Sequence, residues 1–161
     1  MAETPKRAGS RERVRAYLDS HGLAEGLTEF DQPTKTAAQA AEAMGCDLGQ
    51  IVKSLVVVVD GSPVLALVAG DRRGDLDAIA AEAGGEKARM ADADAVRAAT
   101  GYAIGGVSPF DLPEDLTVLI DDSLARFETV FPAAGTPSSM VRIPLDTLLG
   151  LVGGRVARIS H

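Results

Sequence analysis

A run of β-branched and other apolar residues in the middle of the chain restricts the possible folds more than any other feature. Residues 51–59 read IVKSLVVVV, which predicts a strand that is largely buried on both faces. The pair Asp60-Gly61 follows and is typical of a tight turn. Residues 63–69 are therefore expected to form the returning strand of a hairpin.

Short helices and short strands are expected on either side of this hairpin, because polar capping residues and glycines bracket several apolar stretches. The expected helices cover about residues 11–20, the stretch from the cap Thr36 to Gly45, Asp75 or Asp77 to Gly84-Gly85, Asp92 to Thr100, and 145–152 with Pro144 in its first turn. The expected strands cover about residues 27–30, 87–90, 117–121, 128–132 and 139–143, with a helical turn at 122–126. This order lacks a regular βαβα alternation, which predicts one α+β domain over residues 11–161 after a flexible tail of residues 1–10.

Composition excludes several classes of protein. No segment approaches the ~18 consecutive apolar residues of a membrane span, and residues 1–15 lack the apolar core of a signal peptide. The single cysteine, Cys46, excludes an intramolecular disulfide and a cysteine-based zinc site. His21 and His161 are too few for a histidine metal cluster, and His161 is expected to be disordered. We therefore expect a cytoplasmic protein that holds no metal or other cofactor.

The charge of the chain is unevenly distributed. The net charge is −7, but residues 1–15 carry +3 and the remaining residues carry −10. A protein that grips a DNA duplex needs clustered lysines and arginines to neutralise phosphates, which argues against DNA binding here. Aromatic residues make up only 4% of the chain and offer few surfaces on which single-stranded bases could stack. An acidic body of this kind is still compatible with a protein that holds only the end of a nucleic acid.

Lys53 is the first unusual residue, because it interrupts the apolar run of the expected central strand. Burying an unpaired ammonium group is unfavourable. Four interpretations are open: a lysine that snorkels at a sheet edge, a lysine paired with a core carboxylate, a catalytic or ligand-orienting cation, or a strand that faces solvent on one side.

The segment 101–110, GYAIGGVSPF, is the second unusual feature, because it is too rich in glycine to be a regular element throughout. Gly105-Gly106 followed by Ser108-Pro109 suggests a backbone that another molecule approaches closely, since glycine has no side chain to interfere. Exposed amides in such a loop can bind an oxyanion or an ester carbonyl. The alternative is a tight bend between a helix and a strand.

Together these features resemble the YbaK and prolyl-tRNA-synthetase-associated family of aminoacyl-tRNA deacylases over roughly residues 20–155. The resemblance rests on Thr36–Ala41 with Gly45, on Gln50–Leu55 (QIVKSL), on Gly70-Asp71, on Thr100–Tyr102 with Ile104–Phe110 (IGGVSPF), and on Ile120-Asp121. The QIVKSL and GGVSPF stretches in this order are specific together, although either alone would be weak.

The resemblance implies a mixed, mostly antiparallel and barrel-like sheet surrounded by helices. It implies a metal-independent hydrolase that cleaves the ester between a wrongly attached amino acid and the terminal adenosine of a tRNA, acting in trans. By match to the family's motif, Lys53 is the expected catalytic residue, and the aminoacyl end lies against a wall of the loop. The residues expected in that wall are Gly101, Gly105, Gly106, Ser108 and Pro109.

The same resemblance implies partners and substrates. The expected partners are the acceptor end of a mischarged tRNA and prolyl-tRNA synthetase, with no DNA and no membrane. The expected substrates are Cys-tRNA(Pro) or Ala-tRNA(Pro). The alternative function is a non-catalytic module that binds an aminoacyl or nucleotide ligand and accompanies a tRNA synthetase.

The chemistry of the residues agrees with this expectation. An aminoacyl ester is already activated, so an enzyme need supply only positioning and charge stabilisation. A water molecule, or a ribose hydroxyl of the substrate, could assist proton transfer in a chain that has no evident histidine or carboxylate machinery. If the amino acid is cysteine, its own thiolate could attack the ester.

Overall fold

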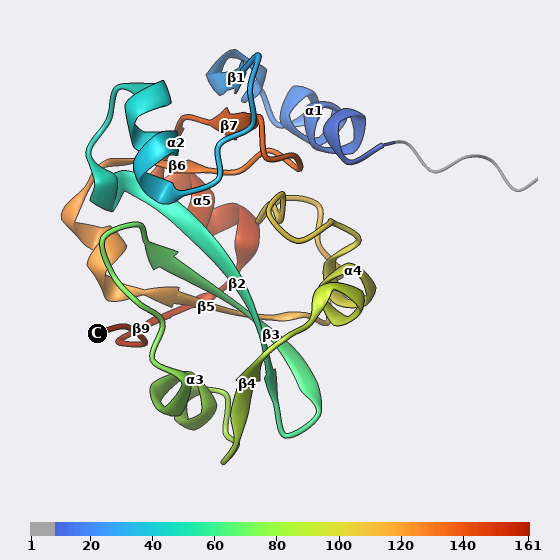
Figure 1. The fold of residues 1–161 in the computed structure, drawn as a ribbon, viewed down its shortest axis with the longest axis vertical. Helices are drawn as coiled ribbons and strands as arrows, with labels where there is room; N and C mark the ends of the chain where they lie inside the picture. Colours follow the sequence, from blue (N-terminus) through green and yellow to red (C-terminus); the bar gives the residue numbers. More distant parts are fainter. Residues whose placement is uncertain (1–8) are drawn as a thin grey trace, which may run out of the picture.

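The computed structural model describes residues 9–161, and the predicted hairpin lies at the centre of a curled sheet (Figure 1). Strands β2 (Ile51–Val59) and β3 (Ser62–Ala69) pair antiparallel along almost their whole length. Successive side chains of a strand point to opposite faces. Val56 therefore packs in the larger hydrophobic core, whereas Val57 packs in a smaller core on the other side of the sheet. The expected burial of both faces is confirmed.

The central sheet has seven strands and mixes parallel with antiparallel pairs. Five strands join the hairpin: β4 (Ala88–Met90), β5 (Thr117–Asp121), β6 (Thr129–Pro132), β8 (Ile143–Pro144) and β9 (Arg155–Ala157). Their order is β8-β6-β2-β3-β5-β9, with β4 also paired to β2. The pairs β2–β6, β3–β5 and β5–β9 are parallel, and β2–β3, β2–β4 and β6–β8 are antiparallel. The predicted mixed α+β fold is confirmed.

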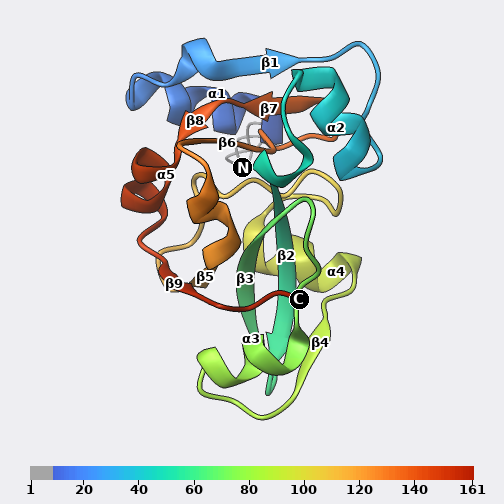
Figure 2. The same ribbon diagram turned by 90° about the vertical axis from the view of Figure 1, so that its left-hand side faces the viewer.

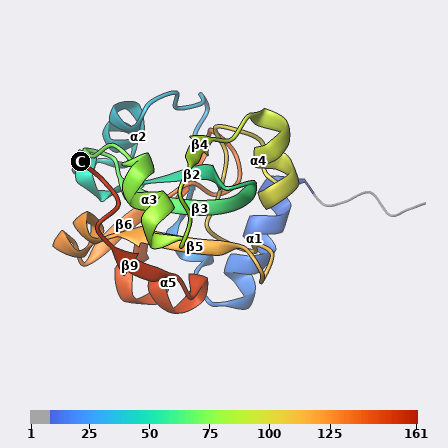
Figure 3. The same cartoon turned by 90° about the horizontal axis from the view of Figure 1, so that it is seen from below.

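Five helices surround this sheet. They are α1 (Ser10–Ser20), α2 (Ala37–Met44), α3 (Leu76–Glu82), α4 (Ala93–Thr100) and α5 (Leu145–Val152) among the described residues. Figure 2 shows α1 and α2 at one end of the molecule and α3 at the other. Seen from below in Figure 3, α3 lies over β2 and β3, where it covers the smaller core.

The helix ends follow the predicted capping residues. The Thr36 side chain accepts a hydrogen bond from the Gln39 amide at 3.1 Å, and Asp92 accepts one from the Ala95 amide at 2.8 Å. Of the two candidates for the start of α3, Asp75 is the cap. Pro144 is the N-cap of α5 and not part of its first turn, because its backbone is still extended where it pairs with β6.

The predicted strand at residues 139–143 is in fact two strands. β7 (Ser139–Val141) pairs antiparallel with β1 (Leu27–Glu29), whereas β8 pairs with β6. The break falls at Arg142, whose amide donates to the Gly26 carbonyl oxygen at 2.8 Å. Residues 139–144 thus contribute one strand to each of two sheets. The local sequence does not indicate this change of pairing partner.

The last residues of the chain hold a distant loop in place. His161 was expected to be disordered, but its amide and carbonyl groups exchange hydrogen bonds with the backbone of Arg73 at 2.8 and 3.0 Å. Gly74 and Ser160 form an isolated antiparallel bridge beside them. The strand β9 just before this segment was not predicted either, because Arg155–Ala157 is short and half exposed. The loop 70–74 therefore depends on backbone pairing with the C-terminal segment.

The predicted tail of residues 1–10 lies mostly outside the described residues. Where description begins, Gly9 is the N-cap of α1 and Ser10 is its first residue. Among residues 9–161, no helix is both long and apolar enough to cross a membrane.

Asp121 links the central sheet to the C-terminal segment. This fully buried carboxylate accepts hydrogen bonds from the Ile159 amide at 2.9 Å and the Ser160 hydroxyl at 2.7 Å, as well as from Ser123. Burial alone would raise the pKa of Asp121, but these hydrogen bonds outweigh burial and hold the pKa below its usual value. Asp121 is therefore both the N-cap of the helical turn at residues 122–126 and a tether for the C-terminal segment.

Replacing Asp121 should destabilise the fold in a pH-dependent way. Asp121→Ala leaves several buried donors without an acceptor, so we expect the free energy of unfolding at pH 7 to fall by about 2–3 kcal/mol. A depressed pKa means that the ionised carboxylate stabilises the fold above the unfolded-state pKa of about 4 and loses this effect as the pH falls through the lower folded-state value. Urea unfolding of both proteins from pH 7 to pH 3 measures this. A difference that stays constant over that range would contradict the prediction.

Candidate functional site

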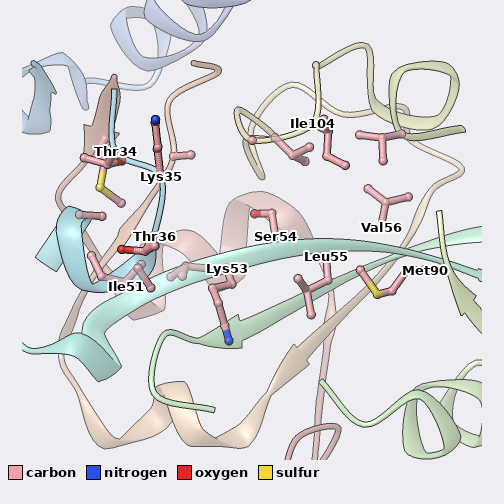
Figure 4. A pocket seen from close by; sticks show the side chains of 18 of the residues that line it. Thr34, Lys35, Thr36, Ile51, Lys53, Ser54, Leu55, Val56, Met90 and Ile104 are labelled. Atoms are coloured by element: carbon pink, nitrogen blue, oxygen red, sulfur yellow. The ribbon is translucent and has the colours of Figure 1, made fainter. Parts of the chain in front are cut away.

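A cavity of about 370 Å³ opens beside the middle of β2. Its walls come from β2, from residues 34–40 at the start of α2, and from the loop after α4 (Figure 4). Buried apolar side chains form its inner part, and exposed residues form its rim. The inner residues include Val52, Val56, Ala91, Val96, Val107 and Met140, and the rim includes Lys35, Thr36, Met90, Ile104 and Gly105.

Successive side chains of β2 point to opposite faces of the strand, so they lie on different sides relative to this cavity. Ser54 and Val56 point into the space between β2 and the loop that carries Ile104, whereas Lys53 points to the other side of the strand (Figure 4). Lys53 still lines the cavity along its edge, and its ammonium group donates to the carbonyl oxygen of Arg72 in the loop 70–74. The lysine is therefore neither exposed nor fully buried.

Among the described residues, no carboxylate contacts Lys53 to neutralise its charge. Burial is the main factor that lowers the pKa of Lys53, the nearby Arg73 lowers it further, and Asp71 acts in the opposite direction. Asp71 is engaged elsewhere, since its two oxygens accept hydrogen bonds from Arg126 at 2.7 and 2.9 Å. Within residues 9–161, Lys53 forms no salt bridge. Of the four interpretations, pairing with a core carboxylate is wrong.

Gly105 is the one predicted glycine that lines the cavity. It has a φ of +89°, in the left-handed region that favours glycine, and a Cβ atom there would lie 3.9 Å from Cγ of Pro137. Gly106 is buried behind it, where a Cβ atom would approach the backbone of Gly135 and Thr136 to 3.0 Å. The loop thus lines the cavity at Gly105 and forms a closely packed bend at Gly106.

The other predicted loop residues support this bend and do not line the cavity. Ser108 is fully buried, and its hydroxyl accepts a hydrogen bond from the Phe110 amide at 3.3 Å. Pro109 is buried as well. Gly101 ends α4 with a φ of +78°, next to the guanidinium of Arg13. The structure therefore brings Lys53 and Gly105 together at one cavity and leaves Gly101, Gly106, Ser108 and Pro109 outside its lining.

Several lining residues were missed by sequence reasoning. Met90 and Ile104 are large apolar side chains at the rim that are 51% and 61% exposed. Ser54 is also a lining residue, and its hydroxyl, which has almost no exposed surface, is the only buried side-chain polar atom of the described residues without a hydrogen-bond partner. A serine next to a conspicuous lysine carries no signal in the sequence, because its role depends on what lies across the strand.

The arginines near the N-terminus are used within the fold. Arg11 forms a salt bridge with Glu29. Arg13 donates to Asp111 at 2.8 Å and lies over the ring of the buried Tyr102, 4.4 Å from its centroid. These two cations therefore hold α1 against the rest of the domain. Within residues 9–161, no three histidine, cysteine or acidic side chains come together as metal ligands.

The chain is similar in sequence to several known proteins. Over 135 residues the chain is 39% identical to YwhH, an uncharacterized protein of Bacillus subtilis, in a match that covers 83% of this chain and 85% of YwhH. It is 31% identical over 140 residues to ProXp-y of Escherichia coli K12, which is named as a multifunctional Ser/Thr-tRNA deacylase, covering 84% and 83% of the two chains.

A solved structure and a family model extend this similarity to the whole fold. The crystal structure of a candidate trans-editing enzyme for prolyl tRNA synthetase superposes with a TM-score of 0.86 and 37% identity, over 99% of both chains. The model of the aminoacyl-tRNA editing domain matches residues 31–151, which include β2, the cavity and the glycine loop. The chain therefore belongs to the aminoacyl-tRNA editing domain family.

Proposed function

We propose that this protein is a trans-editing deacylase that hydrolyses the ester bond of mischarged aminoacyl-tRNA. Its membership of the editing family supports hydrolysis. The observation that carries the proposal is Lys53, a cation that has no carboxylate partner within residues 9–161 and lies at the edge of a cavity large enough for an aminoacyl group. The proposed substrates carry a small amino acid, with Cys-tRNA(Pro) and Ala-tRNA(Pro) as the first candidates. The proposed partners are the tRNA acceptor end and prolyl-tRNA synthetase.

In the proposed reaction, water attacks the ester carbonyl and the acyl–oxygen bond breaks. The amino acid leaves as a carboxylate; one proton of the attacking water passes to the ribose oxygen of the terminal adenosine, and the other passes to solvent. Lys53 stabilises the negative charge that develops on the carbonyl oxygen. Its bond to the Arg72 carbonyl uses one of its three donors, so two remain for the substrate. The Gly106 amide already donates to Ala103 at 3.0 Å, so we assign no oxyanion contact to it.

No step of this proposal requires a metal ion or other cofactor. The polar side chains at the cavity are hydroxyls and ammonium groups, which are poor ligands for divalent cations. Gly105 lines the rim, and a residue without a side chain keeps this stretch of backbone accessible to the substrate.

Removal of the Lys53 ammonium should abolish most of the activity and leave the fold intact. We expect Lys53→Ala to lower the deacylation rate at least ~100-fold, because a charge positioned on the transition state is lost. The assay measures amino acid released from a panel of purified mischarged tRNAs. Lys87→Ala, which removes an exposed lysine from another part of the surface, is the matched control and should keep the wild-type rate.

Three results would contradict this proposal. A folded Lys53→Ala variant with wild-type turnover would exclude the catalytic role of the lysine. Wild-type protein that binds an aminoacyl-tRNA and releases no amino acid would be the non-catalytic module instead. Activity that EDTA removes and a divalent metal restores would show that the reaction depends on a metal.

Substitutions at Gly105 and Gly106 should have different effects, one mainly on substrate binding and the other mainly on the packing of the loop. Gly105→Val adds a branched side chain at the rim of the cavity at a positive φ, and we expect KM to rise ~10-fold with a loss of stability of about 1–2 kcal/mol. Gly106→Val meets backbone atoms behind the loop, so its main effect should be a lower melting temperature. Kinetics and thermal unfolding of both variants measure this. Equal effects of the two changes on KM would show that the loop is only a bend.

Binding of tRNA should depend only weakly on salt. Residues 16–161 carry a net charge of −10, which leaves few cations near the cavity, among them Lys35, Arg72 and Arg73. The slope of log affinity against log salt concentration should correspond to ~1–3 phosphate contacts. Deleting residues 1–8 removes Lys6 and Arg7 and should flatten this slope slightly without changing the rate of hydrolysis. A slope equivalent to ~6 or more contacts would reveal an extensive tRNA surface.

A further inference from the structure

The salt bridge between Arg126 and Asp71 has two-point geometry but lies close to the surface. Two nitrogens of the guanidinium donate to the two carboxylate oxygens, at 2.7 and 2.9 Å. The two side chains keep 38% and 34% of their surface exposed. Solvent screens charges at this exposure, so the pair adds only modestly to the stability of the fold. Its ordered geometry therefore suggests a purpose other than stability.

Arg126 is held in place by contacts besides Asp71. Its Nε donates to the Ser123 carbonyl oxygen at 2.6 Å, and its guanidinium lies over the ring of Phe127, 5.0 Å from the centroid. Both contacts come from the helical turn at residues 122–126 or from the residue after it. An arginine fixed in this way loses little further side-chain freedom when it binds a carboxylate.

The loop 70–74 has other contacts that keep its shape. Backbone hydrogen bonds or bridges anchor it at both ends: Gly70 to Ile51, Arg73 to His161, and Gly74 to Ser160. Arg126 engages the side chain of Asp71 between these anchors. Loss of the salt bridge is therefore expected to release the Asp71 side chain and to leave the backbone of the loop in place.

Lys53 is the cation that a released Asp71 side chain would meet. The Lys53 ammonium donates to the carbonyl oxygen of Arg72, the residue next to Asp71. The charge of Asp71 already acts on the pKa of Lys53, which places the two groups near each other. The two arginines that follow Asp71 in the loop are exposed, whereas Lys53 is partly buried. Partly buried charges are screened less than exposed ones, so Lys53 gains most from a carboxylate partner.

We propose that Arg126 is a positioning residue, which keeps Asp71 from pairing with Lys53 and so keeps the Lys53 ammonium available to the substrate. This proposal rests on the function proposed above, in which Lys53 is the catalytic cation. A carboxylate in contact with Lys53 would neutralise the charge that stabilises the carbonyl oxygen in the transition state. Arg126 itself is outside the lining of the cavity and acts through Asp71.

The first test measures deacylation by three variants, on the mischarged tRNA that the wild type cleaves fastest. Arg126→Ala releases Asp71, and we expect kcat to fall ~10-fold while KM stays within ~2-fold of the wild type. The double variant Arg126→Ala with Asp71→Asn has no carboxylate to offer Lys53, so kcat should return to within ~2-fold of the wild type. Asp71→Asn alone should also keep the wild-type kcat. A merely structural salt bridge predicts that the double variant is no better than Arg126→Ala.

The second test reports on Lys53 without relying on catalysis. Acetic anhydride modifies the unprotonated amine of a lysine, and mass spectrometry gives the rate at Lys53 relative to the exposed Lys87. A carboxylate partner favours the protonated form of a lysine and raises its pKa. At a fixed pH, labelling of Lys53 should therefore slow at least ~3-fold in Arg126→Ala and recover in the double variant.

Arg155→Ala is the matched control. It removes another arginine that pairs with a carboxylate, that of Glu82 at 3.4 Å, and neither residue lines the cavity. Its kcat and its labelling of Lys53 should stay at the wild-type values. Melting temperatures are measured for every variant and should change little, because both salt bridges are exposed.

Each way in which the proposal can fail gives a different result. Wild-type kcat in Arg126→Ala, or an equal loss in the single and double variants, would overturn the role of Arg126 while leaving the deacylase function standing. Labelling of Lys53 that is the same in all variants would overturn it as well. No release of amino acid by the wild type from any mischarged tRNA would instead overturn the deacylase function. Slower labelling in Arg126→Ala would in that case still show that Arg126 keeps Asp71 from Lys53.

Discussion

The burial of β2 on both faces is the constraint on which the rest of the structure depends. Each side of this strand needs its own apolar cover, which α3 provides on one side and the larger core on the other. Because the strand alternates strictly, two adjacent polar residues within it are forced to opposite sides. Lys53 and Ser54 are such a pair, so the lysine reaches the edge of the cavity and the serine stands on the opposite face of the strand.

The distribution of arginines explains how an acidic protein can belong to a family that acts on tRNA. Arg11, Arg13 and Arg126 all pair with acidic side chains within the fold. Arg126 in particular engages Asp71, which would otherwise be the nearest carboxylate to stabilise the charge of Lys53. These three arginines are therefore engaged within the fold, and the few cations near the cavity, among them Lys35 and Lys53, are the ones that a short stretch of nucleic acid would meet.

Short sequence patterns, such as helix caps and turns, predicted most of the fold. The features that they did not predict depend on pairing between segments far apart in the sequence. The caps Thr36 and Asp92 and the turn at Asp60-Gly61 act over a few residues, so the sequence reveals them directly. The split at Arg142, the strand β9 and the anchoring of His161 arise from partners far along the chain. At the site, Lys53 stood out as a charge in an apolar run. Ser54 did not, because an unpaired hydroxyl is visible only when its surroundings are known.

The parallel pairing of β2 with β6 has a consequence for the order of folding. The β2–β3 hairpin joins neighbouring segments and has little loop to close, whereas β2 and β6 bring together residues from early and late in the sequence. Contacts of high sequence separation form slowly, so the hairpin precedes the closed sheet along the kinetic pathway. A nascent or partly folded chain then already exposes the second edge of β2, which β4 covers at Val57–Val59 and β6 covers at Ile51 and Val52. The interval before both strands dock is therefore the period of greatest exposure to aggregation and chaperone binding.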